Sequence, residues 1–257
     1  MNIVEYNMDG TRYRLTSDLH THTTFSHGKG SIEDNVAAAN EKGIGTIGIS
    51  DHGYGHILFG LNHRKMKKMR AETERLKGLY PDMEILLGVE ANILHSGACI
   101  DMTPEEFKDF DYVIAGYHYG ATGRNVLLSA GRLARNMVEN CTGIGEKKLM
   151  RLNTDNMVKA IEENPIRIIS HPWHKYAVDI LEIAAVCARR GTMIEINNGH
   201  LNTLSVEDIR TMALADVKFI LTSDAHTPGR VGDFTAGLSM FLKAGVNIER
   251  IVNLEAV

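Results

Sequence analysis

Short apolar runs rich in β-branched residues alternate along this chain with longer amphipathic segments. The apolar runs predict strands at residues 13–19, 45–50, 84–89, 112–115, 166–169, 192–196 and 217–221. The segments between them predict helices at residues 31–42, 62–79, 126–164 (interrupted at 141–145), 179–190, 206–215 and 234–244, with a further helix starting at 103. Such alternation is typical of parallel strands joined by right-handed crossovers, so it predicts an α/β fold of about seven units, either an open sheet or a closed barrel.

Two of these helices begin with a capping sequence. Ser31 is followed three residues later by Asp34, and Gly43 supplies a stop for the same helix. Thr103 precedes a proline, which suits the first helical position, and Glu106 can complete a capping box. Both sequences therefore predict helix starts directly after their capping residue.

The chain as a whole has the composition of an ordinary globular protein. Its 257 residues contain no linker of low complexity, so we expect residues 1–257 to form a single domain. A net charge of −4 gives no reason to expect nucleic acid as a partner. The N-terminus lacks the pattern of a secretory signal and no apolar run approaches the length of a membrane span, so we expect a cytoplasmic protein without a membrane partner. Three isolated cysteines, Cys99, Cys141 and Cys187, argue against a disulfide framework.

Side chains of metal-ligand type follow almost every predicted strand. They are Asp18, His20 and His22, then Asp51 and His52, then Glu90 and Asn92, then His118, then His171, and finally Asp224 and His226. A single histidine at a strand end is usually a hydrogen-bonded residue, but the repetition at six strands favours metal binding, because unpaired carboxylates and imidazoles crowded together are costly without cations. Groups from many strands converge only where all carboxyl ends face one opening, which favours the barrel.

These strand-end segments match the motifs of a known family in their order along the chain. The chain resembles the polymerase and histidinol phosphatase (PHP) superfamily in Asp18–His22, Ser50–Gly53, Gly88–Asn92, Ser170–Pro172 and Ser223–His226. The segment Glu195–Asn198 is similar to the small stand-alone phosphatases of that family. The resemblance implies a distorted (βα)7 TIM-like barrel with a trinuclear metal centre.

The resemblance also implies which residues hold each metal. His20, His22, Glu90 and Asp224 would bind the first metal; Glu90 would bridge to a second, bound also by His118 and His171; His27, His52 and His226 would bind the third. Imidazole and carboxylate ligands suit zinc, iron and manganese, and zinc is our first choice.

Other polar residues have weaker claims. Five histidines fall outside the implied ligand set and are expected to be ordinary loop residues: His56, His63, His95, His174 and His200. Arg230 follows the last ligands and is a candidate for binding the phosphate of a substrate. Asp18 and Asp51 are candidates for orienting neighbouring ligands.

The activity implied is hydrolysis of a phosphate ester by a hydroxide that bridges two metals. Glu90 would hold those metals, and Asp224 is a candidate to accept the proton of the attacking water. The compact, mildly acidic chain favours a small phosphomonoester as substrate. The alternatives are a phosphodiesterase or exonuclease acting on oligonucleotides, a histidinol phosphatase, and a non-enzymatic metal-binding protein. The sequence leaves open the oligomeric state and the group that protonates the leaving alcohol.

Overall fold

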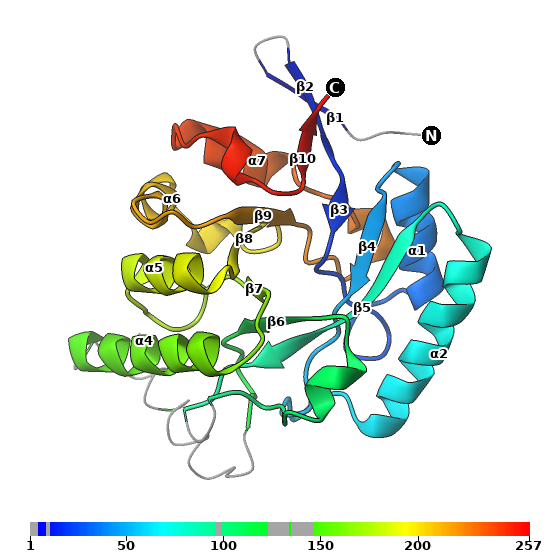
Figure 1. Ribbon diagram of the computed structural model, residues 1–257, viewed down its shortest axis with the longest axis horizontal. Helices are drawn as coiled ribbons and strands as arrows, with labels where there is room; N and C mark the ends of the chain where they lie inside the picture. The colour runs from blue at the N-terminus through cyan, green and yellow to red at the C-terminus, as the bar shows by residue number, and fades with distance from the viewer. Residues whose placement is uncertain (1–4, 9–10, 96–98, 123–133, 135–145) are drawn as a thin grey trace.

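The strands that the sequence predicts form one parallel sheet. The structure is a computed structural model of the 257-residue chain that describes residues 5–8, 11–95, 99–122, 134 and 146–257. Its strands pair in chain order, which makes a nearly closed barrel (Figure 1). They are β3 (Ser17–Asp18), β4 (Thr46–Ile49), β5 (Glu84–Asn92), β6 (Tyr112–Gly116), β7 (Ile168–Ile169), β8 (Met193–Asn197) and β9 (Phe219–Thr222). The predicted α/β barrel is confirmed.

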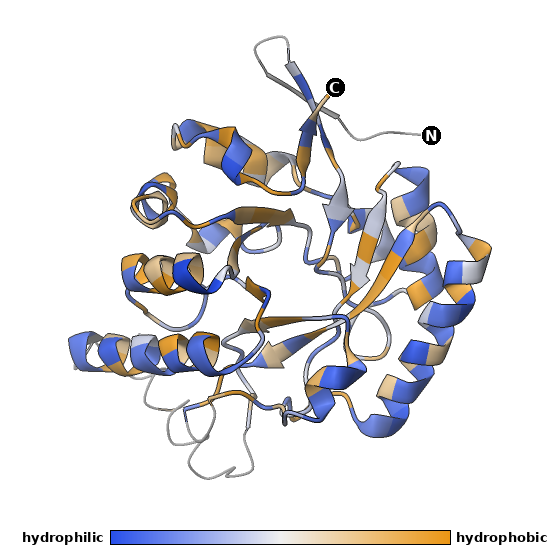
Figure 2. Cartoon of the chain, in the orientation of Figure 1, coloured by the Kyte–Doolittle hydropathy of each residue, from blue (hydrophilic) through white to orange (hydrophobic). Residues whose placement is uncertain are grey.

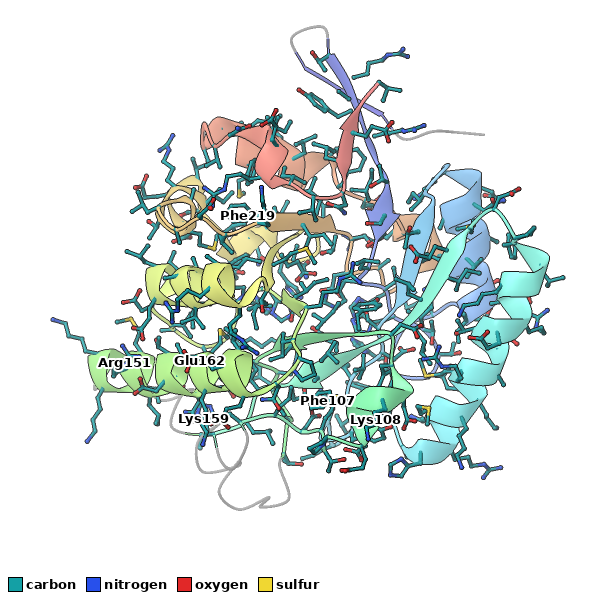
Figure 3. The ribbon with its side chains drawn as sticks, in the orientation of Figure 1. Phe107, Lys108, Arg151, Lys159, Glu162 and Phe219 are labelled. Atoms are coloured by element: carbon teal, nitrogen blue, oxygen red, sulfur yellow. The ribbon has the colours of Figure 1, made fainter. Side chains whose placement is uncertain are left out.

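Helices surround this ring of strands (Figure 1). They are α1 (Ile32–Glu41), α2 (His63–Leu79), α4 (Glu146–Glu163), α5 (Ile180–Arg190), α6 (Val206–Ala213) and α7 (Thr235–Lys243). Apolar residues of the helices and strands face one another, while the outer helix surfaces are largely hydrophilic (Figure 2). For example, Phe219 of β9, which is labelled in Figure 3, packs edge-on against Phe241 of α7, with ring centroids 5.2 Å apart. None of the described helices is long and apolar enough to span a membrane.

The two predicted capping sequences behave differently. Ser31 and Asp34 form the predicted capping box at the start of α1. Thr103 and Glu106 also exchange hydrogen bonds, but only the short 3-10 turn η1 (Glu106–Asp109) follows them, so the prediction of an α-helix there is wrong. The backbone N–H of Asp111 already donates to Leu87 of β5 (2.7 Å), because the chain enters β6 at this point and has no room for further helical turns. Apart from residue 134, the predicted helical segment at 126–145 lies outside the described residues.

The first predicted strand, residues 13–19, is in fact two strands that belong to different sheets. β2 (Thr11–Leu15) pairs antiparallel with β1 (Glu5–Met8) and with β10 (Leu254–Ala256), whereas β3 belongs to the barrel. The change of sheet occurs at Thr16, whose N–H donates to Asn253 O (3.0 Å) and whose carbonyl accepts from Gly45 and Thr46. The pairing with β10 is remote in sequence, so no local pattern could predict it.

The seam between β3 and β9 is closed by side-chain and loop contacts instead of a strand ladder. Asn253 is buried, accepts from the N–H of Leu221 (3.0 Å), and donates to the carbonyls of Ser17 and Leu221 (both 2.7 Å). Beyond the strand ends, the N–H of His22 donates to Ala225 O (2.8 Å). The side-chain amide of Asn253 therefore connects β3 to β9, where no backbone hydrogen-bond ladder joins the two strands.

Tyr112 fills the barrel interior and requires glycine on two neighbouring strands. Its ring packs with Leu19 and its hydroxyl donates to Leu19 O (2.6 Å). A β-carbon on Gly48 of β4 or Gly88 of β5 would lie only 1.9 Å and 2.3 Å, respectively, from atoms of Tyr112. Glycine at these positions lets an aromatic ring close the barrel interior.

We predict that Gly88→Ala destabilises the protein by about 2 kcal/mol, because Tyr112 is buried and the added methyl group overpacks the barrel interior. Gly78→Ala is the matched control: nothing lies within 4 Å of its β-carbon position on α2, so it should stabilise the protein by about 0.5–1 kcal/mol. Urea denaturation of both variants measures these changes. Equal stability of Gly88→Ala and the wild type would contradict the role of Tyr112.

Candidate metal centre

The side chains that follow the strands converge at the carboxyl end of the barrel, as expected for parallel strands in one ring. His20 and His22 follow β3, His52 follows β4, and Glu90 lies near the end of β5. The other strands contribute His118 after β6, His171 after β7, and Asp224 and His226 after β9. These side chains lie close together, as the ion-pair and ring contacts between them show.

Glu90 lies at the middle of this group and is only 1% exposed. Its Oε1 atom lies 2.9 Å from His118 Nε2 and 3.3 Å from His171 Nε2. Its Oε2 atom lies 3.0 Å from His52 Nδ1 and 3.5 Å from His22 Nε2. The two carboxylate oxygens therefore face two different sets of histidines.

Asp224 is the second buried carboxylate, and its two oxygens have different surroundings. Its Oδ1 atom has no hydrogen-bond partner and lies 3.2 Å from His22 Nε2 and 3.6 Å from His20 Nε2. Its Oδ2 atom accepts from Asn197 (3.1 Å) and lies 3.1 Å from His200 Nε2. One oxygen is thus held by neighbouring side chains, and the other is left for a ligand.

His27 joins the group from the loop between β3 and α1. Its Nε2 atom lies 2.6 Å from His226 Nε2, and its ring stacks on His52 with centroids 4.8 Å apart. The structure groups the ligand atoms of His27 and His226 with His22, and those of His52 with His22 and Glu90. His27 therefore lies beside the other candidate ligands, although it comes from a loop and not from a strand end.

Two of the candidate ligands have a backbone conformation that residues with a β-carbon rarely adopt. The φ angles are 26° at His171 and 50° at Asp224. Such a residue carries strain of about 1–3 kcal/mol, and strain of this kind gathers at functional sites. The N–H of His171 is held by Glu195 Oε2 at 3.2 Å, which helps to fix this conformation.

The donor atoms fit divalent cations. Among the described residues, five sets of three have one ligand atom each within 4.8 Å of one another, and every ligand that the sequence suggested lies in at least one set. They are His22–His27–His226, His20–His22–Asp224, His22–His52–Glu90, Glu90–His118–His171 and His171–His200–Asp224. Buried imidazole and carboxylate atoms this close together, with Asp224 Oδ1 lacking a donor, match the ligand chemistry of transition metals.

The electrostatics favour the protonation states that metals require at several of the candidate ligands. Burial lowers the pKa of His22 well below its usual value, and with nearby imidazoles it lowers the pKa of His27 to about 4. Burial likewise lowers the pKa of His118 to about 3. Burial alone would raise the pKa of Glu90, but His118 and His20 outweigh it and hold that pKa well below its ordinary value. Neutral imidazoles beside an ionised carboxylate are the forms that bind a cation. His20 differs, because burial alone would lower its pKa but Glu195, Glu90 and Asp224 outweigh burial and raise it well above its usual value.

A second layer of polar side chains orients the candidate ligands. Glu195 of β8 is fully buried and its Oε1 lies 2.6 Å from His20 Nδ1. Glu195 also accepts from Thr222 (2.5 Å) and Asn197 (2.9 Å). On the other side, Asn92 Oδ1 lies 2.9 Å from His118 Nδ1. Carboxylate–histidine pairs of this kind fix the tautomer and direction of a metal-binding imidazole.

Asp18 and Asp51, which the sequence suggested as orienting groups, mainly hold the chain. Asp18 accepts from the hydroxyl of Ser223 (2.5 Å) and from the N–H of Gly232 (2.8 Å). Asp51 accepts from the N–H and hydroxyl of Thr23 (2.8 and 2.6 Å). Both carboxylates are buried and connect loops from different strands, so they position ligands through the backbone.

A cavity of about 280 Å³ opens above the candidate ligands. Besides those ligands, its described lining includes His56, Phe59, Tyr119, Lys175 and His200. The sequence interpretation set aside His56 and His200 and did not consider Lys175. Their only signal in the sequence was a position in loops that follow strands of the barrel.

The remaining candidates lie away from the cavity. His63 is exposed, as expected for an ordinary loop residue, and His95 packs against Tyr117. Arg230 is not among the described residues that line the cavity and lies 3.3 Å from Asp233, so its proposed contact with a phosphate stays a prediction. Cys99 and Cys187 are buried and form no disulfide among the described residues, Cys99 donates to Asn156 (3.4 Å), and Cys141 lies outside those residues.

Comparison with known proteins places this geometry in context. The model of the PHP domain matches residues 18–199. The probable phosphatase YcdX of Shigella flexneri serotype 5b is 30% identical over 246 residues, which cover 92% of this chain and 89% of that protein. The histidinol phosphate phosphatase of Lactococcus lactis, solved with zinc, L-histidinol and phosphate, has a TM-score of 0.59 at 15% identity and covers 90% of this chain and 94% of its own. The hisK protein of Listeria monocytogenes has a TM-score of 0.62 at 15% identity and covers 84% of this chain and 97% of its own. The similarity to these two solved structures shows the fold.

We predict that Glu195→Gln weakens binding of divalent cations about 10- to 100-fold, because a neutral amide no longer anchors His20. Glu255→Gln is the matched control, since Glu255 makes only a half-exposed ion pair with Arg14 on the small antiparallel sheet. Titration against a chromophoric chelator measures both affinities. An unchanged affinity in Glu195→Gln would show that His20 needs no such anchor.

Proposed function

The chain belongs to the PHP domain family, and on that premise we propose that it hydrolyses phosphate esters with the help of divalent cations, and that small phosphomonoesters are its substrates. One observation carries the proposal: two buried carboxylates and a ring of imidazoles form the floor of a single cavity. The relative YcdX, a probable phosphatase, supports the same reaction class.

The ligand set of the proposal has nine residues. They are His20, His22, His27, His52, Glu90, His118, His171, Asp224 and His226. Glu90 would hold two of the cations, because its two oxygens face different sets of histidines. We propose three cations, with zinc as first choice, and the zinc in the Lactococcus lactis phosphatase supports that choice. When bound, the cations would neutralise phosphoryl charge and make a water molecule more acidic.

The protein's own side chains account for the remaining requirements of the reaction. Asp224 Oδ2 is held by Asn197 and His200, so this carboxylate is oriented before substrate arrives and is a candidate to accept the proton of an attacking water. No serine, threonine or cysteine is among the described residues that line the cavity. This lining favours direct attack by water over a phosphoenzyme on such a nucleophile.

The cavity also indicates the size of the substrate. Its volume of about 280 Å³ is at the lower end of the range for small-molecule sites. A phosphoryl group with a small alcohol fits this volume better than a nucleic-acid chain does. The Lactococcus lactis phosphatase, solved with L-histidinol and phosphate, is an example of this fold with molecules of that size bound.

We expect purified protein to hydrolyse phosphomonoesters in a panel of phosphorylated metabolites, and to lose this activity on chelation and regain it when zinc or manganese is restored. Release of inorganic phosphate is the measurement, with short oligonucleotides and bis(para-nitrophenyl) phosphate as the diester arm. Higher kcat/KM on the diesters would replace the monoester proposal with that of a nuclease. If the protein hydrolyses no ester and unfolds on chelation, the role of the cations is structural.

Glu90→Gln should remove about two cations per chain and lower turnover at least about 10³-fold, because an amide cannot bridge two cations. The barrel should still fold, since the apolar core does not include this residue. His63→Ala is the control, because that histidine is exposed and away from the cavity, whereas His200 contacts Asp224 and is unsuitable. Elemental analysis by mass spectrometry alongside hydrolysis rates decides the assignment. Normal metal content in Glu90→Gln would refute it.

A further inference from the structure

Lys175 has a distinctive position at the cavity. It follows β7 in the same loop as His171, and it is the only lysine or arginine among the described residues that line the cavity. The cavity floor beneath it carries Glu90 and Asp224. The structure therefore brings one cationic side chain to a site whose other polar lining residues are imidazoles, two carboxylates and a tyrosine.

Aromatic packing fixes the loop that carries Lys175. The ammonium nitrogen lies 5.0 Å from the centroid of the Tyr119 ring, within the range of a cation–π contact. The next residue, Tyr176, is buried and stacks on Tyr117 with centroids 4.6 Å apart. His174 N–H donates to His171 O (2.9 Å), which makes a turn between the candidate ligand and the lysine. The lysine is thus held at the cavity by neighbours on both sides.

The charges around Lys175 indicate what its ammonium group can bind. Burial lowers the pKa of Lys175, and without cations Glu90 and Asp224 are the negative charges that oppose this shift and attract the ammonium group. Cations bound to those carboxylates would take up that negative charge and would repel the ammonium group. An anion that lies between the cations and Lys175 removes the repulsion, and the phosphoryl group of a substrate is such an anion.

A monoester and a diester differ in the charge that they offer to this lysine. The phosphoryl group of a monoester carries close to two negative charges above pH 7, because its second pKa is about 6. A diester carries one charge and has a second alcohol in place of an oxygen that could accept from the ammonium group. A fixed cation beyond the metal ligands therefore discriminates in favour of the monoester.

We propose that Lys175 binds a non-bridging oxygen of the substrate phosphoryl group and thereby sets the preference for monoesters over diesters. The inference rests on the proposed function and assigns a specificity-determining residue to it. Tyr119 is the positioning residue, because its ring contacts the ammonium group.

The test compares Lys175→Met, which keeps the length of the side chain and removes its charge, with Lys175→Arg, which restores the charge. We expect Lys175→Met to raise the KM for para-nitrophenyl phosphate and the inhibition constant of inorganic phosphate about tenfold or more, the loss expected for one charge-assisted hydrogen bond. The kcat/KM for bis(para-nitrophenyl) phosphate should fall much less, and metal content should match the wild type. Lys175→Arg should recover most of the phosphate affinity. Lys218→Met is the control, because Lys218 is exposed and precedes β9 at the opposite end of the barrel.

The outcomes separate this inference from the proposed function. An active wild type with unchanged phosphate inhibition in Lys175→Met overturns the role of Lys175 alone. Equal losses on monoester and diester, or a loss of bound metal, would assign Lys175 a structural role and also overturn it. Should the wild type hydrolyse neither ester, the proposed function fails, and calorimetric titration of the metal-loaded proteins with inorganic phosphate still decides whether Lys175 binds the anion.

Discussion

The burial of Glu90 is the central physical constraint on this protein. A carboxylate that is 1% exposed is costly in an apolar interior unless positive charge or hydrogen-bond donors compensate it. Imidazoles from four strand ends surround it, at distances of 2.9 to 3.5 Å from its oxygens. Because these imidazoles follow four different strands, the surroundings of one side chain depend on how β3, β4, β6 and β7 are aligned. The unusual backbone of His171 and the buried Glu195 are parts of the same arrangement.

The barrel separates this polar end from an apolar interior. Tyr112, Leu19 and Ile220 fill the space inside the strands, and Gly48 and Gly88 make room for the tyrosine ring. Charged groups near the strand ends therefore have protein beneath them and the cavity above them. A low-dielectric base of this kind strengthens the attraction between the carboxylates and any cation in the cavity.

The strand-end residues could be predicted because the carboxyl ends of parallel strands lie at the same end of a barrel, independently of the conformation of the loops that join them. The chemistry of His22, Glu90 and Asp224 was therefore readable from position alone, although their binding of metal stays a proposal. Lys175 was missed because it lies well beyond the end of β7, in a loop whose path depends on tertiary packing against Tyr119. His200 was set aside because it follows β8, which carries no candidate ligand, and its contact with Asp224 depends on tertiary packing. The break at Thr16 was missed for a similar reason, since its partner Asn253 is distant in sequence. That residues 1–257 form a single domain stays a prediction. The oligomeric state cannot be predicted from the sequence.

The seam that Asn253 closes has a consequence for how the molecule assembles. The hydrogen bond from its amide to Ser17 joins residues 236 positions apart, and every candidate metal ligand lies between them in the chain. Contacts of such high sequence separation form slowly, because a long loop must close before they contribute stability. A growing polypeptide would thus have all of its histidine ligands before it could shut the ring. The time between synthesis of the ligands and closure of the seam is when a nascent chain is most exposed to the wrong metal, to proteases and to aggregation.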